Sequence, residues 1–555
     1  MAELINGPES VLKGLDLESR QMVINMVRGL RLNLLSKEKI LEFDKKEIFP
    51  EEIIRKMMGP EIGLQLLCIP ESYGGMGGGA RDCCAVTREV ARICLGIGTA
   101  FFAVQLGADP LIVGGTEEQK AKWLGAIAKG NTLVAYAVTE AGAGSNLAAL
   151  KTKADPVLDY AGNITGYKIN GSKQFISTGG YADFITLLAN TPEGPSFFVV
   201  EKGAKGFVQG KGEEKHGIRA SNTSPLSFTD VFVPAENLIG GVPGKGLKQA
   251  NQVFGDTRLM VAALALGAGE AALDIVIPYA KERIQFGSPL SEKQGYTHKL
   301  VVPNAVRLEA AAAYMDEIAL RLDSSAEDLQ VEGAIAKLFA TESANKAADD
   351  AIQALGGYGY IREFEVEKIK RDVKITCIYE GTSEIQQNII STFRWKKTRK
   401  TKGEYYMSIY QEMNKLTDAI SDAGCLYYGL AARALNYTIN LVHENKLTRK
   451  QYIMFALADM MTHVEVGASL SRKAVALLSQ GDQQADKVKV MARVFANETA
   501  QLVARNILII LMGSGAFDQA SVSNFMETCS YNELMRSSQN IINDMDLIAD
   551  MLFGR

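Results

Sequence analysis

The sequence predicts an α+β protein in which helical regions at both ends enclose a shorter β region. Residues 1–130 and 241–555 carry apolar side chains at the three-to-four spacing of amphipathic helices, as in the segment from Ala80 to Cys94. Between them, apolar runs such as Ser196 to Val200 are short and lie between Gly, Asn, Pro and Asp turns, a pattern typical of strands. A chain of 555 residues is too long for one core, so we expect several domains.

The composition excludes several classes of function. The chain has 60 basic and 64 acidic residues and a net charge of -4, and it shows no basic patch for nucleic acid. Its seven cysteines form no C-x-x-C pair, and none of its four histidines has a ligand-spaced partner, so we expect reduced thiols and neither a metal site nor a His-based triad. The segment from Met1 to Gly7 lacks a signal or transit pattern, which predicts a cytoplasmic protein.

The regions follow one another in a simple order. The N-terminal region, residues 1–130, contains a glycine cluster from Gly74 to Gly79 with no Lys-Ser/Thr after it, so we expect a turn there and not a phosphate-binding loop. The β region, residues 131–240, has no helical crossovers of about a dozen residues between its apolar runs, so we expect antiparallel pairing. Long helical patterns return in residues 241–396, beginning with Arg258 to Arg283.

One carboxylate stands in an unusual setting. Glu380 lies between an aromatic residue and a glycine, in the stretch from Ile378 to Gln386. The glycine lets another molecule approach the backbone, and the apolar neighbours Ile378 and Tyr379 would desolvate the carboxylate and raise its proton affinity. Such a group could serve as a base. For this short stretch alone, an exposed Glu in a helix-entry turn is the more frequent case.

The last helical region, residues 405–555, repeats part of the preceding one. The segment from Ala492 to Gly515 matches the segment from Ala336 to Gly359 at a constant offset of 156 residues. The identical pairs are Ala336/Ala492, Phe339/Phe495, Ala340/Ala496, Glu342/Glu498, Ala344/Ala500, Ala348/Ala504, Leu355/Leu511, Gly357/Gly513 and Gly359/Gly515. We infer that the last region is a degenerate copy of residues 241–396; chance similarity of alanine-rich helices is the alternative. The copy lacks a counterpart of Tyr-Glu-Gly-Thr, so we expect it to be catalytically silent.

Two segments, Gln353 to Tyr360 and Ile378 to Gln386, together resemble the C-terminal signature of the acyl-CoA dehydrogenase family. Ile69 to Gly75 similarly resembles the I-P-E-x-x-G-G turn of this family, which lies under the substrate pocket. The resemblance spans roughly residues 45–395. It implies an N-terminal α-helical domain, a middle antiparallel β domain that binds flavin and acyl-CoA, and a C-terminal four-helix bundle that carries the base, followed here by the extra helical domain. This layout is similar to that of very-long-chain members of the family.

Two motifs resemble the flavin-binding segments of the family. Tyr136 to Asn146 resembles Y-x-V-T-E-x-x-A-G-S-D, with Asn146 in place of the Asp, and its small residues would let the backbone meet an isoalloxazine ring. Gly171 to Gly180 resembles G-x-K-x-W-I-T/S-N-G, with Phe175 in place of the Trp; the alternative for Phe175 is a core strand residue. The residues that the resemblance assigns to the flavin here are Tyr136, Val138, Thr139, Gly144, Ser145, Phe175, Ile176 and Ser177.

A third motif resembles the site for the adenine end of FAD. Glu282 to Gly287, with Gln294 beyond it, is similar to the E-R-x-x-F-G turn, whose Arg meets the FAD pyrophosphate of the neighbouring subunit, work suited to a bidentate guanidinium. The resemblance thus implies FAD as the cofactor and a homodimer, or a dimer of dimers. The further residues assigned to FAD are Arg283, Gln285, Phe286, Gln294, Gln353, Gly356 and Gly357, and at the flavin end Thr382 and Glu384.

The resemblance also implies an activity. Glu380 resembles the base that removes the α-proton of an acyl-CoA thioester, and the alternative position for the base in the family is Thr257 here, which cannot serve as a carboxylate. The implied reaction gives trans-2-enoyl-CoA, with electrons passed to electron-transferring flavoprotein. An acyl-CoA oxidase that uses oxygen is one alternative, and a non-catalytic assembly or membrane-associated scaffold with the same fold is the other.

The substrate pocket is expected to be closed by the helix before Asp109. Alignment with the family places Gly98 and Phe102 one turn apart on its acyl-facing side, and a phenyl ring at 102 would penalise long chains. The alternative is that Phe102 points into the helix bundle. The residues assigned to the substrate are Ser145, Arg258, Gly381, Gly98 and Phe102. No basic amphipathic stripe stands out in the last region, so we favour its packing on the core over membrane binding.

Overall fold

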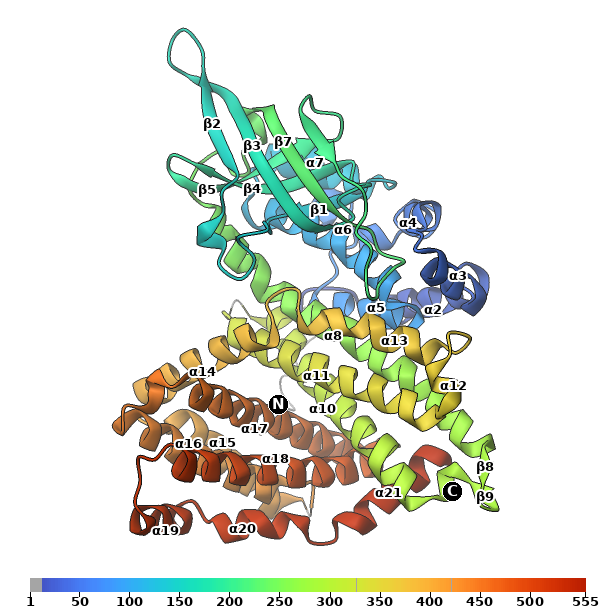
Figure 1. Cartoon of the computed structure of the whole chain (residues 1–555), viewed down its shortest axis with the longest axis vertical. Helices are drawn as coiled ribbons and strands as arrows, with labels where there is room; N and C mark the ends of the chain where they lie inside the picture. Colours follow the sequence, from blue (N-terminus) through green and yellow to red (C-terminus); the bar gives the residue numbers. More distant parts are fainter. Residues whose placement is uncertain (1–11, 326, 421) are drawn as a thin grey trace.

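The computed structural model describes residues 12–325, 327–420 and 422–555. A sheet domain and the N-terminal helices form one end of the molecule, and a stack of long helices forms the other (Figure 1). The helix α8 (Gly246–Glu282) joins the two ends, because it runs from the sheet domain along the N-terminal helices into the helical stack. The chain therefore has the α+β architecture that the sequence predicts.

Three of the N-terminal helices begin at polar capping residues. Side chains of Asp16, Ser36 and Thr116 accept hydrogen bonds from the first turn of the helices that follow them. The helix α6 differs, because it is apolar around its whole circumference and mostly buried between β1 and α8. The helices here are α2 (Leu17–Asn33), α3 (Lys37–Lys46), α4 (Glu51–Met57), α5 (Ala80–Ile93), α6 (Leu95–Gly114) and α7 (Glu117–Ala128).

The sheet has the strand order β1-β4-β2-β3-β7-β6, and β5, off this path, pairs with β4. Its strands are β1 (Val134–Ala137), β2 (Lys153–Leu158), β3 (Ile164–Ser177), β4 (Phe184–Thr191), β5 (Gly194–Glu201), β6 (Phe207–Gln209) and β7 (Thr223–Pro234). The expected antiparallel pairing is found for four strand pairs, but β1 and β2 both lie parallel to β4. The sheet is therefore mixed. The connection from β1 to β4 is made by the β2–β3 hairpin, which is why no helical crossover marks it in the sequence.

The first helical bundle lies below the sheet domain. It consists of α8 with α10 (Val302–Ser324), α11 (Gln330–Leu355) and α14 (Ser383–Lys400), and the shorter α13 (Glu365–Val373) packs on α11 and α8. A small hairpin, β8 (Ile284–Gln285) with β9 (Ser288–Pro289), follows α8. Between the hairpin and α10 lie α9 (Gln294–Tyr296) and the π-helical turn η7 (Thr297–Val301). The short α12 (Gly357–Tyr360) follows α11.

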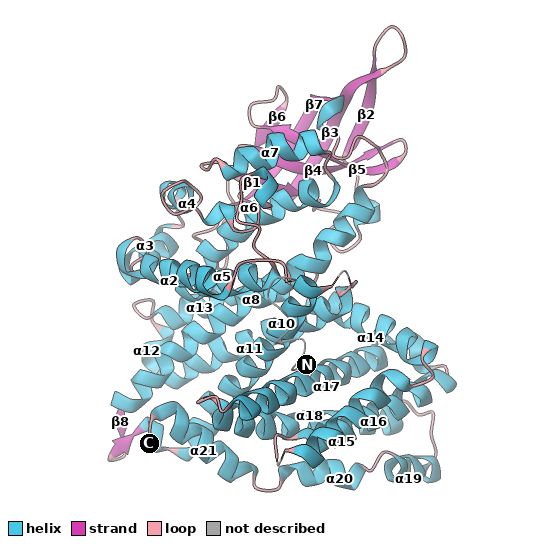
Figure 2. Cartoon of the chain, turned by 180° about the vertical axis from the view of Figure 1, so that it is seen from behind, coloured by secondary structure: helices cyan, strands magenta, loops and turns pink. Residues whose placement is uncertain are grey.

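The extra C-terminal region packs along the outer face of this bundle (Figure 2). Its main helices are α15 (Glu404–Ala419), α16 (Cys425–Glu444), α17 (Gln451–Gln480), α18 (Ala485–Gly513) and α21 (Ile541–Phe553), with the short α19 (Gln519–Thr528) and α20 (Tyr531–Met535) before the last one. A shift of 156 residues brings α11 onto α18 and α10 onto the later part of α17. The helical pattern of the two regions thus follows the offset found in the sequence.

Ion pairs and an apolar core join the two helical regions. On α10, Glu317 pairs with Arg472 of α17 at 3.0 Å. Deeper in the contact, the buried Arg394 of α14 lies between Glu332 of α11 and Glu465 of α17, at 2.9 Å and 2.7 Å. Four helices of the described chain, α6, α8, α17 and α18, are long and apolar enough to cross a membrane, but most of each apolar window is buried within the protein.

Candidate active site

Glu380 lies at the junction of the bundle and the sheet domain, in the loop that leads into α14. Its backbone has a φ of 54° and that of Gly381 has a φ of 92°, so both residues take the left-handed conformation. The positive φ favours glycine at 381, and a Cβ atom there would also displace the Gln386 side chain, whose Nε2 would lie 2.6 Å away. Thr382 then caps α14 by accepting a hydrogen bond from the Ile385 N–H at 3.4 Å.

The carbonyl groups of this loop are held by side chains from two helices. Nε2 of Gln386 donates to the main-chain oxygens of Glu380 and Gly381 at 3.0 Å and 2.9 Å. The ammonium of Lys337, on α11, donates to the same Gly381 oxygen at 2.7 Å. The strained turn is therefore fixed by charged and neutral donors. A residue such as Glu380 outside the favoured backbone regions costs on the order of 1–3 kcal/mol and persists only when its surroundings determine it.

The carboxylate of Glu380 has a raised proton affinity. Burial raises its pKa, whereas the hydrogen bond from Thr257 and the charges of Arg258 and Lys337 act to lower it. The Thr257 hydroxyl donates to Oε2 of Glu380 at 3.1 Å. Nε of Arg258 is buried without a hydrogen-bond partner among the described residues, so one donor next to the carboxylate is left for another molecule.

The segment 138–146, which follows β1, is tied to β3 by a buried ion pair. Nζ of Lys173 contacts Oε1 of Glu140 at 2.8 Å and donates to the Val138 carbonyl at 2.9 Å. Oε2 of Glu140 accepts a hydrogen bond of 2.6 Å from the Lys151 N–H. Burial acts to raise the pKa of Glu140, but Lys173 and the neighbouring donors lower it to about 2. The pair fixes the path of the loop and leaves Gly142 and Gly144 facing open space.

Phe175 is not a core residue. Its side chain is 62% exposed, its φ is 60°, and the next residue, Ile176, is buried. The turn thus directs the ring out of the sheet, on the strand that also anchors the glycine loop through Lys173. Phe175, Phe286 and Glu380, all assigned to the site from the sequence, each adopt a positive φ, and such outliers are frequent where a protein binds a ligand.

Tyr136 connects the sheet domain with the loop that carries Glu380. Its ring stacks on Phe197 of β5 with centroids 5.7 Å apart and meets the edge of Phe254, on α8 and one turn before Thr257. Burial and the charge of Glu380 raise the pKa of Tyr136 well above its usual value. Its hydroxyl is buried without a hydrogen-bond partner within the described chain. Val138 and Thr139 follow directly along the chain, and Ser145 lies exposed at the far end of the loop.

The residues assigned to the adenine end gather around one groove at the far end of α8. The groove has a volume of about 620 Å³, and among its lining residues are Arg283, Gln285, Gln353, Gly356 and Gly357. The guanidinium of Arg283 also lies 5.9 Å from the ring centroid of Tyr358. Gly356 and Gly357 have no atom within 4 Å of an added Cβ, so the floor is open at the end of α11.

Four of the assigned residues lie outside this lining. Phe286, at the tip of the β8–β9 hairpin, is 97% exposed. Nε2 of Gln294 donates to both carboxylate oxygens of Asp546 on α21, at 3.1 Å each, and His298 contacts Asp546 at 3.2 Å. The extra domain therefore reaches the segment that follows the β8–β9 hairpin, which the sequence did not indicate. Thr382 and Glu384 lie at the start of α14, beside Glu380 and away from this groove.

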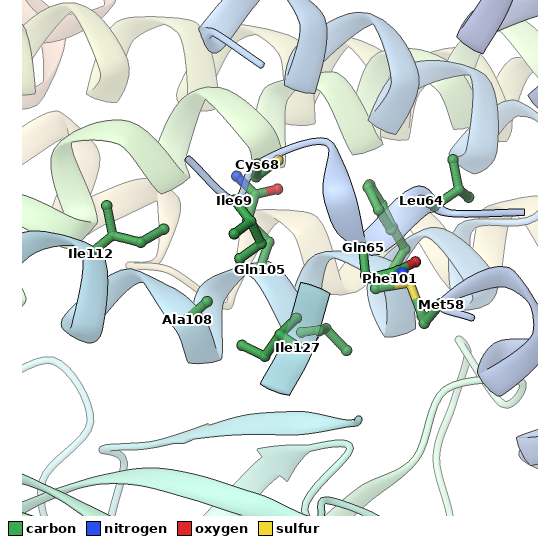
Figure 3. Close-up of a pocket in the computed structure, with 11 residues that line it drawn as sticks. Met58, Leu64, Gln65, Cys68, Ile69, Phe101, Gln105, Ala108, Ile112 and Ile127 are labelled. Carbon is green, nitrogen blue, oxygen red and sulfur yellow. The ribbon is translucent and has the colours of Figure 1, made fainter. Parts of the chain in front are cut away.

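The two residues assigned to the pocket floor are buried in α6. A Cβ on Gly98 would meet Leu264 of α8 at 2.9 Å and Ala91 of α5 at 3.2 Å, so the space beyond Gly98 is filled. Phe101, but not Phe102, lines a cavity of only about 10 Å³ on the side of α6 that faces Cys68 and Ile69 (Figure 3). That cavity holds no more than about one water. Phe102 therefore does not face this cavity, which is too small for an acyl chain.

Comparisons with known proteins agree with this arrangement. The family model for the N-terminal domain of acyl-CoA dehydrogenases matches residues 18–131, and that for the middle domain matches residues 135–231. The model for the C-terminal domain matches twice, at residues 244–393 and 421–550. The chain belongs to the acyl-CoA dehydrogenase family. The resemblance inferred from the motifs is thus confirmed, and the second match accords with a duplicated helical domain.

Individual relatives cover different parts of the chain. An acyl-CoA dehydrogenase of Bacillus subtilis is 39% identical over 383 residues, which are 68% of this chain and 98% of that protein. A solved structure described as electron-transferring flavoprotein of Acidaminococcus fermentans has 36% identity and a TM-score of 0.64, over 68% of this chain and 98% of that one. An acyl-CoA dehydrogenase of Bacillus anthracis, solved with FAD, has 24% identity and a TM-score of 0.84 over 99% and 98% of the two chains, so its fold includes the extra domain.

Membership of this family makes the chain an FAD-dependent oxidoreductase. The residues present fit the cofactor. The open glycine loop with the exposed Phe175 offers a surface for an apolar ring system, and the groove around Arg283 offers a guanidinium for a pyrophosphate. Within the described residues, no group of three His, Cys, Asp or Glu side chains is placed to hold a metal ion. The individual contacts to FAD and substrate stay predictions.

Sequence reasoning missed several residues that shape the site. Thr257 was considered only as a failed base, but it donates to the carboxylate of Glu380. Glu140 and Lys173 stand inside the two flavin motifs, and their spacing of 33 residues gave no sign that they pair. Gln386 stands at the end of the motif that contains Glu380. Lys337 had no sequence signal, because it lies in an alanine-rich helix 43 residues before Glu380.

Proposed function

We propose that this protein oxidises an acyl-CoA thioester to its trans-2-enoyl-CoA with Glu380 as the base. The observation that carries the proposal is the partly buried Glu380, whose pKa is raised by burial and which receives a hydrogen bond from Thr257. A base with a pKa moved toward neutrality transfers protons efficiently near neutral pH. Family membership supports the reaction class.

The residues of the chain have distinct tasks in this proposal. The thioester enters between α6, α8 and the Glu380 loop and displaces water, which raises the pKa of Glu380 further. Glu380 removes the α-proton, and a main-chain N–H at Glu380 stabilises the negative charge that develops on the thioester oxygen. Arg258, with its free Nε, lines the CoA side of the pocket. FAD, when bound, supplies the acceptor for the hydride that leaves the β-carbon.

The residues around the cofactor position it and exclude solvent. The glycine loop, fixed by Glu140 and Lys173, approaches the ring system, and Phe175 covers it. The adenine end lies in the groove around Arg283 and Gln353. If this groove receives the cofactor of a second subunit, the active unit is a homodimer, and a dimer of dimers is the larger alternative. We propose electron-transferring flavoprotein as the electron acceptor, which the similarity to the Acidaminococcus fermentans structure supports.

The test begins with the purified protein and its flavin spectrum. Anaerobic addition of acyl-CoAs of different length and branching should bleach the flavin absorbance for at least one of them. Glu380→Gln keeps volume and hydrogen-bonding capacity, so FAD should stay bound while the bleaching rate falls by about 10²-fold or more. Glu363→Gln, which changes an exposed carboxylate on a loop, is the matched control and should bleach like the unchanged protein.

Two outcomes would overturn the proposal. Normal bleaching of Glu380→Gln would remove Glu380 as the base, and a flavin that no acyl-CoA bleaches would favour a scaffold without catalysis. The electron acceptor is tested separately, by following reoxidation with electron-transferring flavoprotein and with oxygen. Fast peroxide release with oxygen would favour the oxidase over the dehydrogenase.

A further inference from the structure

A buried cation lies directly beneath the catalytic loop. Lys337 is fully buried on α11, and its ammonium donates a hydrogen bond of 2.7 Å to the main-chain oxygen of Gly381. Lysine is almost never fully buried without a charged partner, because desolvation of an ammonium is costly. The hydrogen-bond acceptor here is a neutral carbonyl. The positive charge of Lys337 therefore lies against the residue that follows Glu380, although burial alone would disfavour a charge there.

We propose that Lys337 is a positioning residue for Glu380. Its ammonium holds the Gly381 carbonyl and with it the left-handed turn that presents the carboxylate, and its positive charge favours the ionised form of Glu380. This inference rests on the proposed function, in which Glu380 is the base. It adds a reason why a carboxylate in a desolvated site is ionised often enough to accept a proton.

The charges around Lys337 are balanced so that it stays protonated near neutral pH. Burial lowers the pKa of Lys337 to about 8, and the charge of Arg258 acts in the same direction. Cys377, Glu380 and Glu342 act to raise this pKa. A group with this pKa carries its charge at neutral pH and loses it only under alkaline conditions. At the alkaline pH at which Lys337 loses its charge, Glu380 is already ionised. Lys337 therefore carries its charge over the lower pH range in which Glu380 ionises.

The other groups that face Glu380 show what would remain without Lys337. From α8, Thr257 donates to the carboxylate and Arg258 contributes a second positive charge. From the sheet and the loop, Tyr136 and Tyr379 are buried phenols whose pKa values are raised, so they stay neutral. Removal of Lys337 should thus raise the pKa of Glu380 without abolishing its function, since one cation and one hydroxyl donor persist.

The fold of the loop can survive this removal. Nε2 of Gln386 donates to the same Gly381 oxygen and to that of Glu380, so neither carbonyl loses its last donor when Lys337 is replaced. Methionine has a similar length and no charge, and its burial is favourable. Lys337→Met therefore removes the positive charge while keeping a side chain of similar length. Lys337→Arg keeps a positive charge that cannot lose its proton.

The experiment is a pH profile of the bleaching rate at saturating acyl-CoA, over the pH range in which each variant keeps its FAD. The rate rises with pH as the base ionises, so the acid limb reports the pKa of Glu380. In Lys337→Met this limb should move to higher pH, because the mutation removes a positive charge that lowers the pKa of Glu380. Under alkaline conditions the two profiles should converge.

Three further proteins complete the test. Lys337→Arg should restore the acid limb, and Lys346→Gln, which removes a lysine from the exposed side of the same helix, should leave it in place. An unmoved acid limb in Lys337→Met, even with a uniform loss of rate at every pH, would overturn the inference. If Met is not tolerated, Lys337→Gln is measured by the same criterion. A wild-type flavin that no acyl-CoA bleaches would instead refute the proposed function itself.

Discussion

Phe339 of α11 and Phe495 of α18 lie 156 residues apart in the sequence, and their rings meet with centroids 5.3 Å apart. The same offset separates Ser469 from Ala313, and the Ser469 hydroxyl donates to the Ala313 carbonyl at 3.2 Å. Residues at equivalent positions of the two helical regions thus face each other. Such self-matching contacts are characteristic of two-fold interfaces between identical subunits. We infer that the extra domain packs on the catalytic bundle as a second copy of that bundle would.

The first prediction concerns the stability of this shared core. Phe495 is fully buried, and truncation of a buried Phe costs about 3–5 kcal/mol. Because its ring contacts Phe339 in the catalytic bundle, Phe495→Ala should lower the melting temperature of both regions together. Thermal unfolding followed by circular dichroism and by flavin release should show coincident transitions at a lower temperature. Phe393→Ala, at a half-exposed site on α14, is the control. Flavin release at an unchanged temperature would show that the two regions unfold independently.

The second prediction concerns removal of the extra domain. A chain cut after Lys402 loses Glu465, so Arg394 keeps Glu332 but lacks its second carboxylate, and the apolar face around Phe339 becomes exposed. Exposed apolar faces of this kind promote association. Light scattering after gel filtration should show a larger oligomer or aggregates for the truncated chain than for the full chain at equal concentration. A truncated chain with the same subunit number and good solubility would contradict the inferred packing.

Several features of the site followed from the sequence, and others depend on contacts between distant residues. Glu380 and the glycine loop are local motifs, so their roles could be predicted before the fold. The parallel pairing of β1 with β4 could not, since the connecting hairpin looks like ordinary antiparallel sequence. The contact of Gln294 with Asp546 joins residues from opposite ends of the helical region. Packing decides such contacts, and a single sequence carries no local sign of them.

The third prediction follows from the buried pair of Glu140 and Lys173. The pKa of Glu140 falls from 4.5 to about 2 on folding, so the pair contributes stability above pH 4.5 that is lost as the pH falls toward 2. Glu140→Gln leaves Lys173 buried without its partner, which costs about 3–5 kcal/mol at neutral pH. The difference in melting temperature between the unchanged protein and Glu140→Gln should therefore narrow as the pH is lowered from 4.5 toward 2. A constant difference would show that the charge of Glu140 is not what the loop needs.

The last prediction concerns the length of the acyl chain. Thr99 adjoins Tyr379, which precedes the proposed base Glu380, and Phe102 lies three residues further on the same side of α6. We therefore expect the Phe102 ring to occupy space that several methylenes could fill, each worth about 0.8 kcal/mol of burial. Phe102→Gly should move the optimum of kcat/KM up by at least two carbons in a series of saturated acyl-CoAs.

A matched variant separates this effect from a general loss of packing. Phe101 is as deeply buried as Phe102, but it lines the small cavity that faces Cys68, so Phe101→Gly should lose similar stability and keep the original length profile. Beyond Gly98 the side chain of Leu264 closes the space, and Phe102→Gly combined with Leu264→Ala should extend the accepted chain further than Phe102→Gly alone. Equal length profiles for the unchanged protein and for Phe102→Gly would show that another residue forms the pocket floor.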